Sequence, residues 1–433
     1  MRLRSVKSVQ GFIFENPTLV VFSLNLFHLT SQAALVNRSI LYMRKEVSRQ
    51  LALFDVLRGI AIIFVFGYHW HQAYFPQALT ATNGPVLSFQ QATLSNLYAT
   101  FSPLAYGNLG VQLFLIISGF LIHYSFLGKQ EPLNYRQFML RRFWRIYPTY
   151  LLVLLFFAFQ NQQLTQYVLR EERGQLSFIT HLFLIHNLFD DADILFGFNG
   201  SFWSLALEMQ LYALYPLLLV LRKRYSLSKV CLGLLLVHLV VISYCFYHLR
   251  FKFSEITFVG HFWIMWALGA LVAENYYYGR RTFRVSAPIL AALFLVFLST
   301  KFFPTFYVFF QYIGSAILFA MLLDYLLVSR LNFTAPSYKI LSLIGVCSYS
   351  FYLIHQPILG TIYNSIDLLG MARHWPWFKF VNASVAFAFI TFLSYSLYLV
   401  VEKNSVTLGQ RLSFLRKPVR VPKPQKTYES VEE

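Results

Sequence analysis

The chain has 433 residues, of which 57% are hydrophobic and only 12% charged, and its mean hydropathy is +0.53. Soluble globular domains of ordinary composition carry about twice that share of charged residues, so the composition excludes that class and indicates an integral membrane protein. The net charge of +18 does not indicate nucleic acid as a partner, because the basic residues lie in short segments between apolar stretches, where they set orientation.

Apolar stretches long enough to cross a bilayer recur along nearly the whole chain. A membrane-spanning helix needs about 20 residues and must satisfy its own backbone hydrogen bonds, so we predict an all-α, polytopic helical bundle. The segment 176–189 is shorter and precedes acidic residues, so we expect a re-entrant or interfacial helix there. Ten transmembrane helices are predicted, at 53–75, 109–127, 146–160, 202–221, 230–249, 256–277, 285–303, 307–328, 345–363 and 379–401.

The lysines and arginines indicate the orientation of these spans. With the N-terminus inside, 29 of the 36 basic residues lie at the inner side. If 176–189 also crossed, the loops "RKRYSLSK" and "RRTFR" would face outward, against the positive-inside bias. We therefore predict a multi-pass protein of the inner (plasma) membrane with both termini in the cytoplasm.

The two ends of the chain depart from the pattern of spans. Residues 1–52 form an N-terminal extension, and its apolar stretch at 18–36 is an extra span, an interfacial helix or the result of an over-long gene start. The segment 53–402 is the predicted transmembrane domain. Residues 403–433 are basic and then mixed in charge, so a disordered cytoplasmic tail is expected.

The cysteines do not indicate a metal site. Cys231, Cys245 and Cys347 lie within or at the edge of apolar segments and form no CxxC pair. No spacing of cysteine and histidine suits zinc, so we interpret the cysteines as small core residues and predict no bound metal.

Ionisable residues inside the predicted spans need a partner, water or a function, because charge in hydrocarbon is costly. In "LFDVLRGIAIIFVFGYHWH", Arg58 lies near the inner edge, and His69 lies about 16 Å further along the helix. By the same measure, His355 is near mid-membrane and Glu208 is about 9 Å below the outer edge. A lone intramembrane histidine is usually a hydrogen-bonded core residue, whereas a carboxylate at that depth favours a functional role for Glu208.

A second basic cluster occurs in "FMLRRFWRIYPTYLL", before the predicted third span. Arg142 and Arg145, three residues apart, share one face of a helix. They form either a positive-inside anchor flanked by interface aromatics or an anion site, since guanidinium groups bind phosphate bidentately. The small residues of "SGF", which include Ser118, predict close helix packing.

Taken together, these motifs resemble the membrane-bound acyltransferase family 3 over residues 54–411. The resemblance includes the R-x10-H pattern of Arg58 and His69, the R-x-x-R of Arg142 and Arg145, and a W-S-L-x-x-E motif beginning at Trp203. The matching stretches, in the family's order, are "FDVLRGIAIIFVFGYHW", "GVQLFLIISGFLI", "RRFWRIYP", "SFWSLALEMQLYALYPLL", "SYSFYLIHQPIL" and "VEK". Val56, in place of a common glycine or alanine, and Met209, in place of a second acidic residue, depart from the family pattern.

The resemblance implies transfer of an acyl group, often acetyl, from cytoplasmic acyl-CoA to a hydroxyl of an envelope carbohydrate or glycolipid. It implies no bound cofactor, with acyl-CoA as co-substrate and membrane lipids as the surroundings. By resemblance, the catalytic residues are His69 and Glu208, the donor-binding residues are Arg58, Arg142 and Arg145, and the further site candidates are Ser118, His355 and Trp203.

The chemistry of these side chains suits acyl transfer. Histidine has a reference pKa near 6.5, so His69 is suited to accept the proton of an attacking hydroxyl, while Glu208 would orient that imidazole or bind sugar hydroxyls. Direct transfer is favoured over a covalent acyl-histidine relay, although nothing in the sequence separates them. Intramembrane His and Glu also build proton relays, so the alternative is a proton-coupled transporter or flippase of a polar envelope precursor.

Overall fold

The computed structural model describes residues 52–73, 103–129, 131–247, 257–300, 304–329, 331, 335–368 and 378–413. Every regular element in these segments is helical, which confirms the predicted all-α class. Residues 1–51 of the predicted N-terminal extension, and residues 414–433 of the predicted tail, lie outside the described part of the chain.

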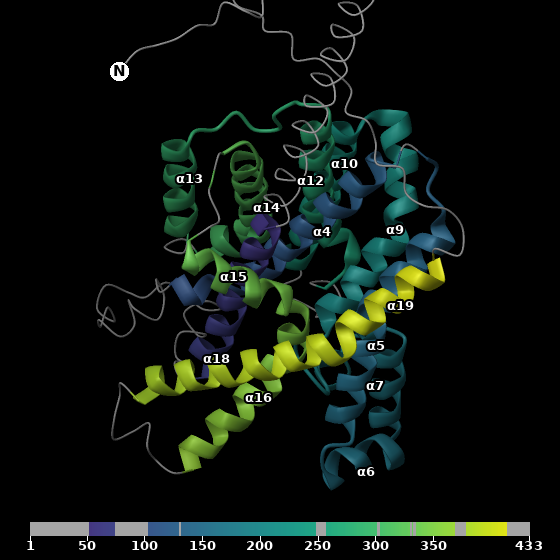
Figure 1. Cartoon of the computed structure of the whole chain (residues 1–433), viewed down its shortest axis with the longest axis vertical. Helices are drawn as coiled ribbons and strands as arrows, with labels where there is room; N and C mark the ends of the chain where they lie inside the picture. Colours follow the sequence, from purple (N-terminus) through teal and green to yellow (C-terminus); the bar gives the residue numbers. More distant parts are fainter. Residues whose placement is uncertain are drawn as a thin grey trace, which may run out of the picture. The chain divides into compact units, whose positions relative to one another are not determined.

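The helices pack as a bundle in which partners are often distant in sequence (Figure 1). The first described helix is Ala52–Ala73. It is followed by η2 (Pro103–Leu109), α4 (Gly110–Leu127), α5 (Tyr135–Ala158), α6 (Gln162–Arg170), α7 (Glu172–Leu182), η3 (His186–Leu188), α8 (Ala192–Leu195), α9 (Trp203–Tyr225), α10 (Leu227–Tyr247), α12 (Val259–Tyr277), α13 (Ala287–Ser299), α14 (Pro304–Val328), α15 (Pro336–Val346), α16 (Ser348–Leu368), α18 (Phe378–Leu397), η5 (Tyr398–Glu402) and α19 (Lys403–Ser413).

Several of these helices have the length and composition of membrane spans. Six helices in the described segments pass both criteria, and the number rises to eight if two bent pairs each count as one span. The pairs are α5 with α6, bent by 103°, and α15 with α16, bent by 75°. Helix α13 is 13 residues long and therefore reaches only about 20 Å. The number ten and the cytoplasmic termini remain predictions.

Helix α5 begins earlier than the predicted span 146–160. The Asn134 side chain accepts a hydrogen bond from the backbone N–H of Gln137 and so caps the helix at Tyr135. Arg142 and Arg145 consequently lie within the helix, not before it. Hydropathy located the apolar part of this helix and missed its polar first turns, where the cap sets the start.

The expected interfacial helix at 176–189 is divided. Helix α7 ends at Leu182, and Leu184 has a positive φ of 55°, which turns the chain into the short helix η3. Arg173 on α7 hydrogen-bonds Asp191, the N-cap of α8, and lowers the pKa of that carboxyl below its ordinary value. This exposed ion pair links α7 to α8.

The predicted disordered tail begins with a helix, which corrects that expectation for residues 403–413. Helix α18 continues through the π-helix η5 into α19, and α19 lies against α5 (Figure 1). A Cβ atom added to Gly409 would be 2.3 Å from Trp144 Cβ, so only glycine permits this approach. Charge and polarity in residues 403–413 therefore reflect an exposed helix face and not an unfolded chain.

Helices α4 and α12 cross closely at two glycines. A Cβ atom on Gly119 would lie 2.0 Å from the Trp266 carbonyl oxygen, and one on Gly269 would lie 2.1 Å from the Ile116 carbonyl oxygen. The crossing confirms the close packing predicted from "SGF". It also brings the side chain of Trp266 against Ser118, whose Oγ atom is 3.3 Å from the indole nitrogen.

Gly269→Ala is expected to destabilise the bundle, because the added methyl must push two backbones apart. The cost of such overpacking is typically about 1–3 kcal/mol, which corresponds to a fall of several degrees in melting temperature. Gly233→Ala on α10 is the control, since a Cβ atom there meets nothing within 4 Å. Thermal unfolding in detergent checks both variants, and equal melting temperatures would contradict the tight crossing.

Candidate active site

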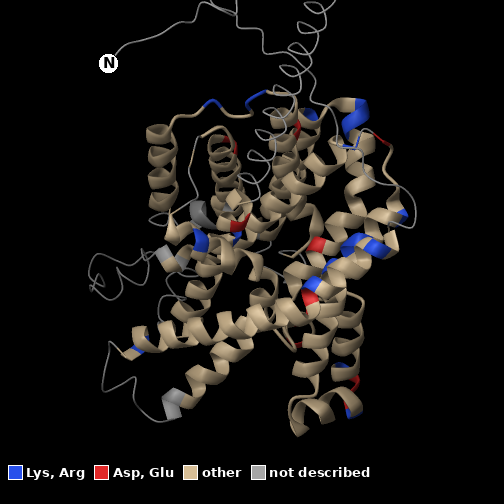
Figure 2. Cartoon of the chain, in the orientation of Figure 1, with Lys and Arg blue, Asp and Glu red and all other residues tan. Residues whose placement is uncertain are grey.

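Charge is sparse along the helices and is concentrated in a few places. Figure 2 shows basic segments where α5 and α19 cross and in the loop between α12 and α13, while most of the ribbon carries no charge. The first turns of α5, "YRQFMLRRFWR", hold four arginines, and α19 carries Lys403 and Arg411. Helix α5 therefore carries a concentrated positive charge in its first half.

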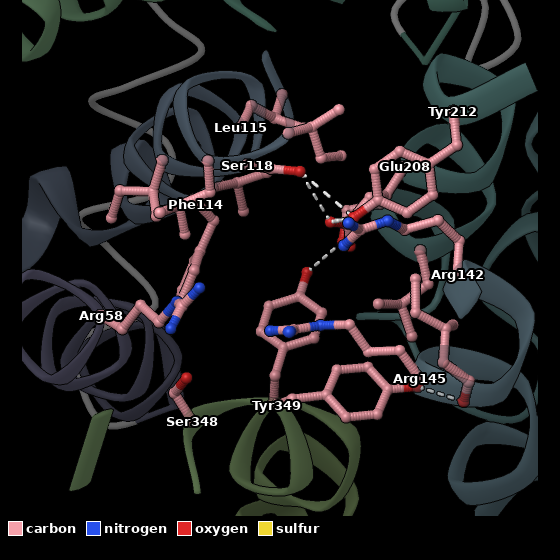
Figure 3. Close-up of a pocket in the computed structure, with 18 residues that line it drawn as sticks. Arg58, Phe114, Leu115, Ser118, Arg142, Arg145, Glu208, Tyr212, Ser348 and Tyr349 are labelled. Atoms are coloured by element: carbon pink, nitrogen blue, oxygen red, sulfur yellow. Dashed lines mark hydrogen bonds between the residues drawn. The ribbon is translucent and has the colours of Figure 1, made fainter. Parts of the chain in front are cut away.

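A cavity of about 250 Å³ lies between the helix Ala52–Ala73, α4, α5, α9 and α16. Three arginines line it, one from the first of these helices and two from α5, and Glu208 from α9 faces them (Figure 3). Ser118 contributes the small hydroxyl on α4. The structure thus brings together five of the residues singled out in the sequence: Arg58, Ser118, Arg142, Arg145 and Glu208.

The arginines are not matched by an equal number of carboxylates in the cavity wall. Arg58 Nη1 lies 3.2 Å from Asp55 Oδ1, one turn earlier on its helix. The Arg142 guanidinium lies over the Tyr212 ring at 5.5 Å, and its Nε atom is buried with no hydrogen-bond partner in the described part of the chain. Guanidinium groups gathered in a desolvated cavity are stabilised by a bound anion. The cavity is therefore suited to a negatively charged ligand.

Glu208 is held by two hydroxyl groups. Ser118 Oγ donates to Glu208 Oε1 at 3.1 Å, and the Tyr212 hydroxyl, one turn further along α9, donates to the same oxygen (Figure 3). The hydrogen-bond partners of Glu208 among the described residues do not include His69, so the structure does not support orientation of the imidazole, and the alternative role of binding sugar hydroxyls stays a prediction. Depth along a helix was predicted from residue spacing, but the face of α9 that carries Glu208 turns toward α4.

His69 and His355 form a pair outside this cavity. Their ring centroids are 5.2 Å apart, and His69 also hydrogen-bonds the Gln72 side chain. His355 Nδ1 is 2.9 Å from the Tyr352 carbonyl oxygen, while its Nε2 atom is buried without a partner among the described residues. Tyr352 lines the cavity, so the histidine pair lies directly behind one wall.

Trp203 also lies outside the cavity. It begins α9, and its ring packs against Phe262 of α12 at 5.5 Å between centroids. The residue that follows it, Ser204, lines the cavity and hydrogen-bonds the Tyr352 hydroxyl at 2.6 Å. The packing of Trp203 helps to hold the first turn of α9 against α12.

His123 and His238 occupy ordinary hydrogen-bonded positions, as expected of a lone intramembrane histidine. His123 contacts the Tyr215 hydroxyl at 3.1 Å and Glu274 at 3.2 Å, and Glu274 is paired with Arg222. His238 Nδ1 is 3.0 Å from the His261 carbonyl oxygen. These contacts join α4, α9, α10 and α12 at positions away from the cavity.

Sequence reasoning missed several residues of the site. Tyr212 follows Glu208 by four residues and so shares its helix face, which was the available signal. Tyr349 and Tyr352 lie within "SYSFYLIHQPIL", a motif that was recognised only as a whole. Glu402 of "VEK" is buried, and its Oε2 atom accepts a hydrogen bond from Ser350 at 2.7 Å.

Comparison with known proteins identifies the family of this chain. The peptidoglycan O-acetyltransferase OatA of Listeria monocytogenes is 24% identical over 358 residues, covering 75% of this chain and 51% of that protein. The acyltransferase MdmB of Streptomyces mycarofaciens is 27% identical over 161 residues, which is 37% of each chain. The chain thus spans about half of the first relative's length, and no solved structure matches it significantly. The model of the acyltransferase domain family matches residues 51–399, most of the sequence, and this chain therefore belongs to that family.

Proposed function

We propose that this protein transfers an acyl group, normally acetyl, from acyl-CoA to a hydroxyl of a cell-envelope carbohydrate. Family membership supports acyl transfer, and the similarity to a protein named peptidoglycan O-acetyltransferase supports a carbohydrate acceptor. Multiple apolar helices support a multi-pass membrane location, where such an acceptor and its lipid carrier are within reach.

The cavity with three arginines is the observation that carries the proposal. Acyl-CoA bears several phosphate charges, and Arg58, Arg142 and Arg145 offer charge-assisted, bidentate donors to such groups. The arginines belong to loop-proximal parts of their helices that the positive-inside rule assigns to the cytoplasm. We infer that the donor enters from the cytoplasmic side with its thioester directed toward Glu208 and Ser118.

The histidine pair supplies the base in this proposal. His69 accepts the proton of the acceptor hydroxyl, and His355 packs against its ring and fixes its position. His69 reaches the reacting groups beside Tyr352, which lines the cavity and whose carbonyl oxygen contacts His355. Glu208 acts at the donor side of the same site, where its carboxylate accepts hydrogen bonds from Ser118 and Tyr212.

The assay uses purified protein, acetyl-CoA labelled in the acetyl group and a panel of glycans. We expect label to move into at least one glycan. A protein that eluted as a folded species but left all label in acetyl-CoA across the panel would contradict acyl transfer. Uptake of an unmodified glycan by proteoliposomes would instead favour the alternative function, a proton-coupled transporter or flippase.

Sealed membrane vesicles test the donor side. Acyl-CoA does not cross a bilayer, because its phosphates are charged. Inside-out vesicles are therefore expected to use externally added acetyl-CoA, whereas sealed right-side-out vesicles are not. Equal transfer in both preparations, with vesicle integrity confirmed by an impermeant dye, would contradict a donor entrance on the cytoplasmic side.

A further inference from the structure

Ser118 has the surroundings of an activated nucleophile. Its Oγ atom lies 3.1 Å from Glu208 Oε1 and 3.2 Å from the Tyr212 hydroxyl, and it lines the cavity (Figure 3). The indole N–H of Trp266 points at the same Oγ atom from 3.3 Å. A nucleophile within hydrogen-bond reach of a base, with a further group fixing its orientation, is the arrangement used in covalent catalysis.

The direction of these hydrogen bonds follows from the chemistry of the groups. An indole N–H can only donate, so Ser118 Oγ accepts from Trp266. The hydroxyl proton of Ser118 is then left to point at Glu208, or at Tyr212, which itself donates to Glu208. Either route ends at the same carboxylate. A lone pair of Oγ remains free to face the cavity.

The fold fixes this geometry through backbone contacts. Gly119, the residue after Ser118, allows the Trp266 backbone to approach so closely that a Cβ atom would lie 2.0 Å from its carbonyl oxygen. Trp266 itself is fully buried. The indole donor and the serine are therefore held by two tightly crossed helices and do not depend on a mobile loop.

The size of the cavity favours using it for one substrate at a time. Ligand pockets commonly measure about 300–1,000 Å³. This cavity has about 250 Å³, which is below that range and suits part of one donor. Direct transfer requires donor and acceptor to be present together. A covalent carrier removes that requirement, because the donor leaves before the acceptor enters.

We propose that Ser118 carries the acyl group as an ester between donor and acceptor, a step that rests on the proposed acyl transfer. Ser118 Oγ attacks the thioester carbonyl, its proton passes to Glu208, and the C–S bond breaks to release CoA as a thiolate. The acceptor hydroxyl then attacks the ester and gives its proton to His69. Glu208 returns its proton to Ser118 Oγ as the C–O bond breaks, and His69 gives the acceptor's proton up to water, which regenerates the enzyme.

The direct test is to incubate the full-length protein with acetyl-labelled acetyl-CoA and no acceptor. We expect label on the peptide that contains Ser118, stable to neutral hydroxylamine but released by alkaline hydroxylamine, as an oxygen ester is. Adding acceptor should move the label into glycan. Ser118→Ala should remove the label, whereas Ser394→Ala, a buried helix serine that bonds the Ile390 carbonyl, should not.

Ser118→Cys keeps the test decisive if the alanine variant is poorly folded. A thiol at this position should take the label as a thioester, which neutral hydroxylamine cleaves, so the chemistry of the adduct follows residue 118. Glu208→Gln should slow labelling by about 10²-fold or more, since it removes the base. Trp266→Phe, at a positioning residue, should lower the labelling rate without raising the KM for acetyl-CoA.

Four results overturn the relay, and they distinguish its failure from failure of the proposed function. If wild-type protein acetylates a glycan but never carries label, or if Ser118→Ala keeps the wild-type rate, transfer is direct and only the relay fails. If wild-type protein neither carries label nor acetylates any glycan while folded, the proposed function fails with it. Label on a histidine, released at neutral pH, would also exclude Ser118 as the carrier.

Discussion

His69→Ala is expected to lower kcat for acyl transfer to the acceptor by about 10²- to 10⁴-fold, the usual contribution of a general base. The imidazole at this position contacts His355 and Gln72, and the proposal assigns to it the proton of the acceptor hydroxyl. The KM for acyl-CoA should change little, because the arginine cavity does not include His69. Steady-state kinetics with labelled donor measure both constants.

His71→Gln is the matched control for this variant. His71 is buried and lies two residues further along the same helix, which rotates it by about 200° to another face. It should therefore keep the wild-type kcat. A His69→Ala protein that eluted normally and retained wild-type kcat would remove His69 from the mechanism. Loss of activity in both variants to the same extent would indicate a structural effect of the helix.

Residue spacing in the sequence gives the depth of a side chain along its helix but not the neighbours of that helix. Spacing gives height along a helix at about 1.5 Å per residue, so His69 and His355 were predicted at similar depth, and their rings are 5.2 Å apart. Spacing does not say which helices are neighbours. Orientation of His69 by Glu208, one of the two roles expected of that carboxylate, depends on such a neighbour relation, and the structure instead places Glu208 against α4 and His69 against α16.

Helices that are apolar all round give no signal for their buried face. For α4 and α12 the direction of packing is visible only through Gly119 and Gly269, whose missing side chains permit the crossing. The role of Trp266 depends on that crossing, and the sequence shows it only as one tryptophan among 81 aromatic residues, counted as 46 Phe, 28 Tyr and 7 Trp. Tertiary contact, and not local pattern, makes it part of the site.

The polar borders of helices were the least predictable elements. Hydropathy placed the third span at 146–160, but capping by Asn134 starts the helix at Tyr135. Arg142 and Arg145 therefore lie within a regular helix and not in a loop before it. Polar residues after position 402 were expected to be disordered, yet α19 packs on α5 because Gly409 fits against Trp144. In both cases a specific contact decides a boundary that average composition cannot locate.

Arg142→Gln and Arg145→Gln are expected to raise the KM for acetyl-CoA far more than the KM for the acceptor. A hydrogen bond to a charged group contributes about 1.5–3 kcal/mol, so each substitution should weaken donor binding by about 10- to 100-fold. The kcat at saturating donor should fall much less, because the proposal assigns these arginines to binding of the donor and assigns the reacting groups to Ser118, Glu208 and His69. Lysine at either position should restore part of the affinity, since it keeps the charge but not the bidentate geometry.

Two controls tie this effect to the phosphates. Arg141→Gln removes the neighbouring charge from α5, but Arg141 does not line the cavity, so its donor KM should stay close to wild type. Acetyl-pantetheine has the thioester and lacks the phosphates, so wild type and both cavity variants should use it equally poorly. If the variants instead bound acetyl-CoA as well as wild type, or lost affinity for acetyl-pantetheine to the same degree, the arginines would not be binding the donor's phosphates. Their charge would then serve to anchor α5 at the membrane surface, and the anion-binding cavity would lose its support.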